Sequence, residues 1–302
     1  MRRILHIDTV KQCNKIVGET TLHPLVSVID LSKINREEFY TLQVDFYCFV
    51  LKEYKCEHFA FGRKECDYSD ATVVFLSPGK AIDMERNHDV EVSGGWLLAF
   101  HPELLKGTCL GMRIDEYTFL NYNNEEALHI SGREKKIFMR CLENVNEELH
   151  RCIDRHSREL VTKSIDLLLS YCSRFYERQF IVRNELNKCQ MKKTNKIINE
   201  YYLNGKGISK DLPSTKHFAD LLGISPAYFT DLLKQETGHT ITEYIQAKRM
   251  EIAKKWLRET DKTVANISTT LGFSSLEYFG RLLKKVIGYT PDEYRKTYGT
   301  GN

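Results

Sequence analysis

The chain of 302 residues is 42% hydrophobic and 28% charged, which suits about two folded domains and excludes a disordered chain. No run approaches the roughly 18 consecutive apolar residues of a membrane span, and no signal-peptide apolar region follows the N-terminal arginines. Residues 190–302 carry 18 Lys and Arg against 12 Asp and Glu, whereas the remainder is slightly acidic, which predicts a polyanion-binding module on a separate carrier domain.

Short apolar, β-branched and aromatic runs dominate the first hundred residues. Turn residues such as Ser77-Pro78-Gly79 separate the runs from one another. The runs are 24–30, 44–51, 56–62, 71–79 and 94–102. Strands of this length at this spacing predict an antiparallel barrel or sandwich.

Two long amphipathic helices are predicted to follow the β region, over about 131–152 and 157–178. Ser131 with Glu134 offers a capping box at the start of the first helix. The apolar faces of these helices must be buried either on the barrel or against a second copy of the chain. Both arrangements stay open for these faces; dimerisation through residues 131–179 is our hypothesis, and the expected assembly is a homodimer.

The domain boundary is predicted within residues 180–195, which are polar and have little apolar periodicity. The first domain would then span residues 1–185 and the second residues 186–302.

An internal repeat of about fifty residues marks the second domain. Residues 218–244 match residues 267–294, with an offset of 49 at Leu222-Gly223 and of 50 after one inserted residue. Each copy reads as a short helix, a turn that begins with glycine, and a second helix, which is the helix-turn-helix unit. One copy alone is equally consistent with a plain three-helix bundle, but two copies in a basic region favour DNA binding.

The two helix-turn-helix units are placed at about 214–238 and 263–288. Ser225 and Ser274 are the predicted N-caps of their second helices. Helical phase predicts a core face that consists of Phe229, Leu232 and Leu233 in the first unit and of Phe279, Leu282, Leu283 and Val286 in the second.

The opposite faces are the predicted DNA-reading surfaces, because this side of the second helix enters the major groove in DNA-bound helix-turn-helix proteins. The predicted DNA-binding residues are Ala227, Thr230, Asp231, Lys234, Ser275, Glu277, Gly280, Arg281, Lys284 and Lys285. Lysines and the helix N-termini would hold phosphates, and Arg281 would contact a guanine through both ends of its guanidinium group. Thr230 and Glu277 would supply adaptable base contacts.

A linker helix is predicted between the units, over residues 241–259, with Thr240 and Glu243 as its capping box. Nineteen helical residues span about 28 Å. Successive major-groove faces on one side of B-DNA are ~34 Å apart, so a rigid spacer of this length would let both units enter adjacent grooves.

Residues 192–298 resemble the DNA-binding domain of the AraC/XylS family of bacterial transcription regulators. The resemblance is carried by ISTTLGFSSLEYFGRLLKKVIGYTPDEYR at 267–295 and by RMEIAK at 249–254. It implies a domain of seven helices that begins near residue 192, in a regulator that acts with RNA polymerase at promoters. It further implies a cupin-like barrel in the N-terminal half, where residues 75–82 and 95–108 resemble a sensor arm of this family.

Several positions depart from the family pattern. Ser268 stands where the family usually has Ala, and Leu233 and Leu283 replace a more usual Phe, which are tolerable changes of size. Gly280 costs its helix up to ~1 kcal/mol relative to Ala. Asp231 occupies a position where the family often has Arg; its carboxylate could accept a hydrogen bond from cytosine N4 or, the reading we favour, pair with Lys234.

The N-terminal domain is expected to bind a small-molecule effector. Four aromatic residues of the predicted strands could line its cavity, although such residues are more often core: Phe46, Tyr47, Phe49 and Trp96. The ten histidines form no His-x-His pair, so we expect neither metal nor cofactor. The nine cysteines form no Cys-x-x-Cys pair and are expected to be reduced structural thiols.

The sequence thus predicts an α+β protein with two domains, a cupin-like barrel with two helices and an all-α domain of two helix-turn-helix units. Its predicted function is sequence-specific regulation of transcription in the cytoplasm, associated with the nucleoid. The expected partners are double-stranded promoter DNA, RNA polymerase, an effector and a second copy of the chain. The first alternative is an enzyme with a DNA-binding tail, which would need a reactive cysteine in a recognisable context; none of the nine has one, so no catalytic residue is expected. The second alternative is an architectural DNA protein, which would bind every duplex nearly equally.

Overall fold

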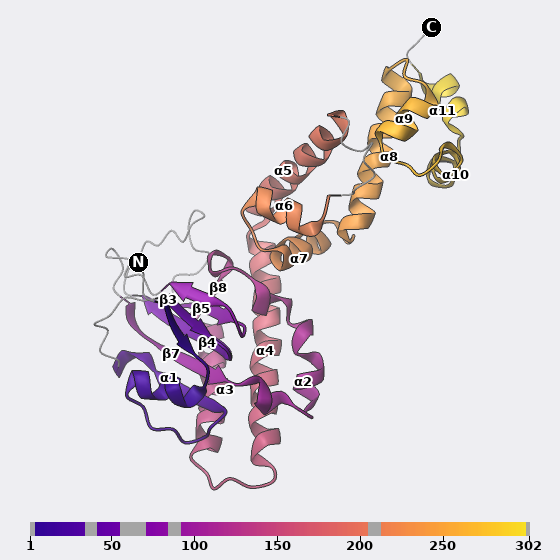
Figure 1. Cartoon of the computed structure of the whole chain (residues 1–302). Helices are drawn as coiled ribbons and strands as arrows, with labels where there is room; N and C mark the ends of the chain where they lie inside the picture. The colour runs from indigo at the N-terminus through magenta and orange to yellow at the C-terminus, as the bar shows by residue number, and fades with distance from the viewer. Residues whose placement is uncertain (1–3, 34–40, 55–70, 84–91, 205–212, 300–302) are drawn as a thin grey trace. The chain divides into compact units, whose positions relative to one another are not determined.

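The computed structural model describes residues 4–33, 41–54, 71–83, 92–204 and 213–299 (Figure 1). The chain divides into two compact units, Met1–Arg183 and Asn184–Asn302. We call them unit 1 and unit 2. No helix of the described residues is both long enough and apolar enough to cross a membrane.

Unit 1 is built on two β-sheets. The described strands are β1 (Ile4–Ile7), β2 (Val26–Asp30), β3 (Thr41–Val44), β4 (Tyr47–Tyr54), β5 (Ala71–Leu76), β6 (Ala81–Asp83), β7 (Val92–Phe100) and β8 (Leu128–Ile130). The larger sheet has the order β2-β7-β4-β5-β8 and is antiparallel throughout. The smaller sheet has the order β1-β3-β6, and its β1–β3 pair is parallel.

Of the two predicted arrangements, a barrel or a sandwich, the closed barrel is corrected, because the described strands form two separate sheets that share one apolar cluster. The expectation that all strands are antiparallel is also wrong, since β1 and β3 pair in parallel. The predicted run at 56–62 lies outside the described residues.

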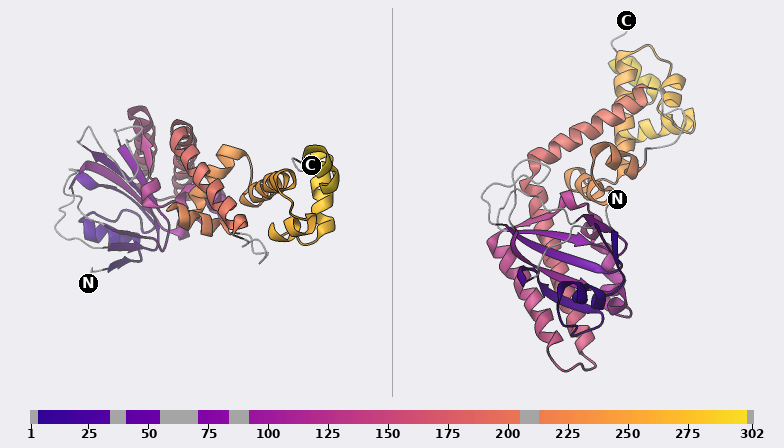
Figure 2. Two further views of the ribbon diagram at one scale, coloured as in Figure 1. Left: turned by 90° about the horizontal axis from the view of Figure 1, so that it is seen from above. Right: turned by 60° about the vertical axis from the view of Figure 1, so that its left-hand side comes forward.

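The larger sheet is buried on both faces, as the period of two in its strands allows. On one face Cys48, Val74 and Leu97 share an apolar cluster with Ile7 and Val44 of the smaller sheet. Aromatic residues such as Phe75 occupy the other face, where Phe75 contacts Phe119 and Tyr176. Helices cover this second face (Figure 2). The result is three layers: small sheet, large sheet and helices.

The helices of unit 1 confirm one local prediction and add elements that were not foreseen. The two long helices are α3 (Gly132–Leu149) and α4 (Ser157–Val182), and the capping box of Ser131 and Glu134 is present at the start of α3. Helix α1 (Val10–Val17) was not predicted, although Thr9 caps it through a capping box with Gln12. A chain of short helices joins β7 to β8: α2 (Cys109–Arg113) and the 3₁₀ turns 102–105, 114–116, 118–121 and 124–126.

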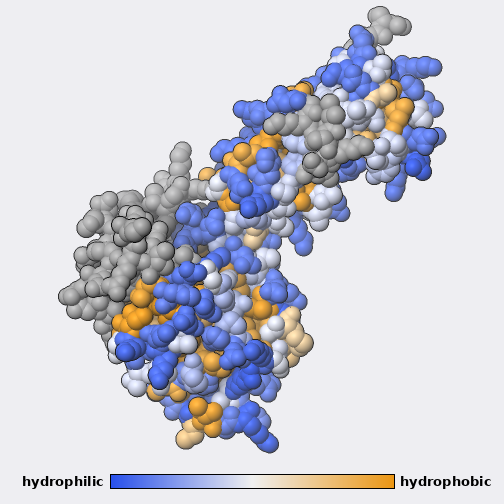
Figure 3. Space-filling model, viewed as in Figure 1, coloured by the Kyte–Doolittle hydropathy of each residue, from blue (hydrophilic) through white to orange (hydrophobic). Residues whose placement is uncertain are grey.

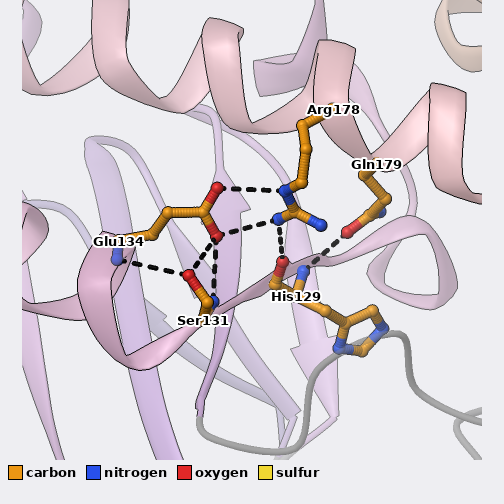
Figure 4. Close-up of polar contacts among 5 residues, drawn as sticks. All are labelled: His129, Ser131, Glu134, Arg178 and Gln179. Atoms are coloured by element: carbon orange, nitrogen blue, oxygen red, sulfur yellow. Dashed lines mark hydrogen bonds and ion pairs between the residues drawn. The ribbon is translucent and has the colours of Figure 1, made fainter.

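Two side chains of helix α4 make hydrogen bonds to the main chain along the outer edge of β8, where no further strand pairs among the described residues (Figure 4). Gln179 accepts a hydrogen bond from the His129 N–H at 2.8 Å and donates to the Ala127 carbonyl at 3.1 Å. Arg178 donates to the His129 carbonyl at 2.6 Å and binds both carboxylate oxygens of Glu134 at 3.0 Å. The edge groups of β8 are thereby satisfied, and α3, α4 and the sheet are joined.

Unit 2 is all helical in its described part, where seven helices are present. They are α5 (Asn184–Leu203), α6 (Thr215–Leu222), α7 (Pro226–Thr237), α8 (Ile241–Glu259), α9 (Val264–Thr270), α10 (Leu276–Ile287) and α11 (Pro291–Tyr298). Helix α7 packs against α5, α6 and the start of α8, whereas α10 packs against α9 and α11 (Figure 1).

Candidate nucleic-acid interface

The first helix-turn-helix consists of α6 and α7. Gly223 ends α6 in the left-handed conformation, with φ of 65°, which glycine adopts without strain. The Ser225 hydroxyl accepts a hydrogen bond from the Tyr228 N–H at 3.1 Å, and Pro226 follows at the first helical position. Phe229 stacks on Phe218 with 5.7 Å between ring centroids, which fixes α7 against α6.

On the outward face of α7, two of the four predicted residues are exposed. Thr230 and Lys234 are exposed, whereas Ala227 and Asp231 are half-buried. The Thr230 hydroxyl donates to the Pro226 carbonyl at 2.8 Å, so its oxygen lone pairs face outward.

The second helix-turn-helix consists of α9 and α10, and here two local predictions are wrong. The N-cap of α10 is Ser275, which accepts from the Tyr278 N–H at 3.0 Å, and not Ser274. Val286 is 54% exposed rather than buried, because it lies in the last turn of α10, beyond the elements that cover Phe279. Phe279 and Leu283 are buried as predicted, whereas Leu282 is only half-buried.

The outward face of α10 carries three exposed basic side chains, Arg281, Lys284 and Lys285. Among the described residues no hydrogen bond or ion pair holds these side chains. The pKa of the Glu293 carboxyl is lowered mainly by a backbone hydrogen bond, and Lys284 lies near enough to lower it further. Glu277, also exposed, lies in the first turn, where a carboxylate interacts favourably with the helix dipole. The cations of this helix are therefore available to an external anion.

Gly280 lies at the edge of this face, toward α11. A methyl group built at Gly280 would lie 3.9 Å from Cδ of Pro291, an ordinary contact distance. Gly280 is half-buried, whereas Thr230, its counterpart in the repeat, is exposed.

The two reading helices differ in charge. Helix α7 carries Lys234 against Asp231 and Glu236, whereas α10 carries three basic residues against Glu277. Attraction to a polyanion should therefore come mainly from α10.

Two exposed residues at the start of α10 were not anticipated. Leu276 is 49% and Tyr278 43% exposed, in the first turn of the helix. Helical phase places both residues at the border of the buried face of α10, and this placement could have indicated that they are exposed. Apolar side chains at this end of a reading helix can contact thymine methyl groups.

Within unit 2, helix α8 lies between the two helix-turn-helix motifs along the chain. Its 19 residues correspond to about 28 Å, and its first turn contains the predicted capping box of Thr240 and Glu243. Hydrogen bonds from Thr240 hold the pKa of the Glu243 carboxyl below its usual value, since they favour the charged form. Helix α8 contacts α5 and α7 and also contacts α9 and α11, so it packs against helices of both helix-turn-helix motifs.

The four aromatic residues proposed for effector binding do not surround one cavity. Phe46, which directly precedes β4, is fully buried in the apolar cluster between the two sheets, and Phe49 of β4 is fully buried against Phe75 and Phe100. Tyr47 stacks on Phe100 with 4.9 Å between centroids. Trp96 is half-buried. A cavity of about 340 Å³ does exist in unit 1, but it is lined by other residues: His23, Leu25, Glu103, Leu104, Lys106 and Arg158.

One group of side chains in unit 1 has metal-ligand chemistry, on β1 and at the β3–β4 turn. His6 contacts Asp8 through Nδ1 at 3.3 Å and Asp45 through Nε2 at 3.1 Å. The hydrogen bond to Asp45 raises the pKa of His6. Both ring nitrogens are thus already engaged, and all three side chains are about half exposed.

The described cysteines are free thiols. Four of them are buried, and burial raises the pKa of Cys13 to about 11 and that of Cys48 and Cys172 well above the usual value. These buried thiols are poor nucleophiles, since the thiolate is the reactive form.

Comparison with known proteins identifies the C-terminal part of the chain. A family model described as a helix-turn-helix domain matches residues 218–297. The bifunctional transcriptional activator/DNA repair enzyme AdaA of Bacillus subtilis is 34% identical over 100 residues, which are 33% of this chain and 46% of that protein. The xylose operon regulatory protein of Escherichia coli is 37% identical over 90 residues, which are 30% of this chain and 22% of that protein.

Among solved structures, the C-terminal domain of the response regulator AraT from Geobacillus stearothermophilus is 26% identical, covers 37% of this chain and 88% of that domain, and has a TM-score of 0.31. The chain therefore matches less than half the length of these two curated relatives. With its two helix-turn-helix units, the C-terminal part of this chain is a DNA-binding domain of the AraC type.

Proposed function

We propose that the protein is a sequence-specific transcription regulator whose helices α7 and α10 enter adjacent major grooves of promoter DNA. The observation that carries this proposal is the pair of helix-turn-helix motifs that helix α8 joins. Helix α8 gives a spacing of about 28 Å, close to the ~34 Å between successive groove faces.

The contacts are proposed residue by residue. Lys234, Lys284 and Lys285, together with the helix N-terminus at Ser275, hold phosphates, and Arg281 reads a guanine. Thr230 and Glu277 make adaptable base contacts, and Ala227, Asp231 and Gly280 border the same surfaces. All ten residues lie on α7 or α10 or at the N-cap of α10.

Binding-site selection from random duplexes, followed by affinity measurement at several salt concentrations, tests the proposal. A specific regulator should prefer its site over random DNA by at least ~10³-fold, whereas an architectural protein would show almost no preference. Arg281→Ala should weaken specific binding by ~10-fold or more and blur one base position.

The lysines should behave differently. Lys284→Ala should weaken binding to all DNA sequences alike and should reduce the slope of log affinity against log salt concentration by about one unit. The double variant of Lys284 and Lys285 should reduce this slope by about two units. Lys11→Ala on α1, an exposed lysine of unit 1 outside the proposed interfaces, is the control and should change neither quantity. An Arg281→Ala variant with unchanged affinity and footprint would overturn the assignment of the reading face.

For unit 1 we propose a cupin-like sensor that forms a homodimer through α3 and α4. Two sheets that enclose one apolar core support the first part. For the second, Leu160 and Leu167 are each 47% exposed on α4, seven residues apart, and thus share one face of the helix with Tyr171. Leu167→Glu should convert a dimer into a monomer in sedimentation analysis, and a monomeric wild-type chain would refute this part.

An effector and RNA polymerase are proposed as further partners, with no catalytic activity of the chain itself. With Trp256 replaced by Phe, the half-buried Trp96 becomes the sole tryptophan and reports metabolite binding to unit 1. Added metabolites that leave both this fluorescence and DNA affinity unchanged would argue against an effector.

A further inference from the structure

Arg249 lies in the middle of α8 and is only 6% exposed. Among the described residues of unit 2 it is the only Lys, Arg, Asp or Glu that is buried. Desolvation of the guanidinium group lowers its pKa, so burial of this charge requires compensating contacts.

Those contacts connect α8 to the turn of the second helix-turn-helix. Arg249 Nε donates to the Leu271 carbonyl at 2.8 Å, and Leu271 is the C-cap of α9. The guanidinium carbon lies 4.0 Å from the centroid of the Phe273 ring. A third contact, from Nη1 to Oε1 of Gln246 at 3.0 Å, holds the side chain in place from one turn earlier on α8.

The contact continues into the reading helix. Phe273 lies 4.8 Å from Phe279 between ring centroids, and Phe279 is the fully buried core residue of α10. Arg249, Phe273 and Phe279 therefore form an uninterrupted path from α8 to α10. Both a planar donor and a cation above a ring depend on orientation, so this path resists rotation of α10 relative to α8.

A second arginine attaches the same block of helices to α8 at another point. Arg295 of α11 donates to the Leu257 carbonyl at 3.4 Å and to the Lys262 carbonyl. The block α9–α11 would therefore remain attached to α8 without Arg249 but would no longer be held in one orientation.

We propose that Arg249 is a positioning residue that sets the orientation of α10 relative to α8, and thereby the spacing of DNA half-sites that the two reading helices accept. The inference rests on the proposed function. Arg249 is buried and does not touch DNA; it acts through the Leu271–Phe273 turn.

The test measures affinity for a selected site and for versions with one base pair inserted or removed between the two half-sites. One base pair changes the relative rotation of the half-sites by about 35°, which a rigid reader should not tolerate. The wild-type chain should therefore lose ~10-fold or more in affinity on each altered spacing.

Arg249→Met removes the donors and the charge but keeps most of the apolar volume. It should bind the natural spacing more weakly, whereas its loss on the altered spacings should shrink to about threefold or less. The salt slope should stay unchanged, because the phosphate contacts remain. Arg258→Ala, at an exposed arginine of the same helix, is the matched control and should retain the wild-type spacing profile.

Should Arg249→Met fail to fold, Phe273→Leu removes the ring below the guanidinium group while retaining an apolar side chain, and should flatten the spacing profile in the same direction. A folded Arg249→Met or Phe273→Leu variant with the wild-type spacing profile would overturn the inference. Absence of site-specific binding by the wild-type chain would instead overturn the proposed function, so the two failures are distinct.

Discussion

Gly280→Ala tests both the packing of α10 and the extent of the reading face. Glycine in a helix interior is about 0.5–1 kcal/mol less favourable than alanine. The new methyl group would meet only Cδ of Pro291, at 3.9 Å, so no steric cost offsets this gain. We therefore expect unit 2 to become more stable by ~0.5–1 kcal/mol, which for a domain of this size raises Tm by about 2–4 °C.

The chain offers its own reporter for this measurement. It has two tryptophans, and Trp256 lies in unit 2, where it is 6% exposed. In a Trp96→Phe background, urea unfolding followed by fluorescence reports unit 2 alone. Gly223→Ala is the matched control: its φ of 65° is strained for any residue with a Cβ, so the same substitution should destabilise unit 2 by ~1 kcal/mol or more.

The same variant separates two roles of Gly280. If only α11 lies beside this position, DNA affinity should be unchanged within about twofold. A stabilised protein with clearly weaker DNA binding would show that DNA approaches Gly280 closely. A destabilised protein would refute the packing of α10 against Pro291 from which the gain was calculated.

Further predictions concern both units. Arg178→Ala removes three charge-assisted hydrogen bonds and leaves Glu134, 15% exposed, without its cation, so unit 1 should lose about 2–4 kcal/mol in urea unfolding followed through Trp96 in a Trp256→Phe background. Arg151→Ala, at an exposed position after α3, should cost less than about 0.5 kcal/mol, and equal losses would refute the role of Arg178 at the edge of β8. Tyr202→Phe removes a buried hydroxyl that has no hydrogen-bond partner among the described residues, so unit 2 should keep its stability or gain ~1 kcal/mol. Burial raises the pKa of Tyr202 from 10.0 to about 12, so unit 2 should keep its stability up to about pH 10 and lose stability as the pH rises toward 12. This alkaline loss should be smaller in Tyr202→Phe.

Features formed by neighbouring residues were predictable from the sequence. The capping boxes at Ser131 and Thr240 and the left-handed glycine at Gly223 depend on contacts within about four residues. The N-cap of α10 is an instructive failure, because Ser274 and Ser275 both satisfy the local pattern. The repeat offset of 50 pairs Ser225 with Ser275, which is the residue that caps the helix.

Burial by distant partners was not predictable in the same way. Val286 belongs to the apolar face of α10 by helical phase, yet in the last turn of that helix its side chain is 54% exposed. Phe46 and Phe49 are three residues apart, just before β4 and within it, but only the tertiary packing decides what each of them contacts.

The order of residues therefore determined the starts of α3 and α8, the two copies of the helix-turn-helix motif in the C-terminal part, and the basic side chains on the outward side of α10. Only the tertiary structure decided that Arg178 binds the main chain at the edge of β8 and that Arg249 binds the turn of the second helix-turn-helix. The physical reason is distance along the chain: Arg178 binds groups 44 and 49 residues away, and Arg249 a carbonyl 22 residues away. Such contacts exist only after the chain has folded, and no local periodicity records them.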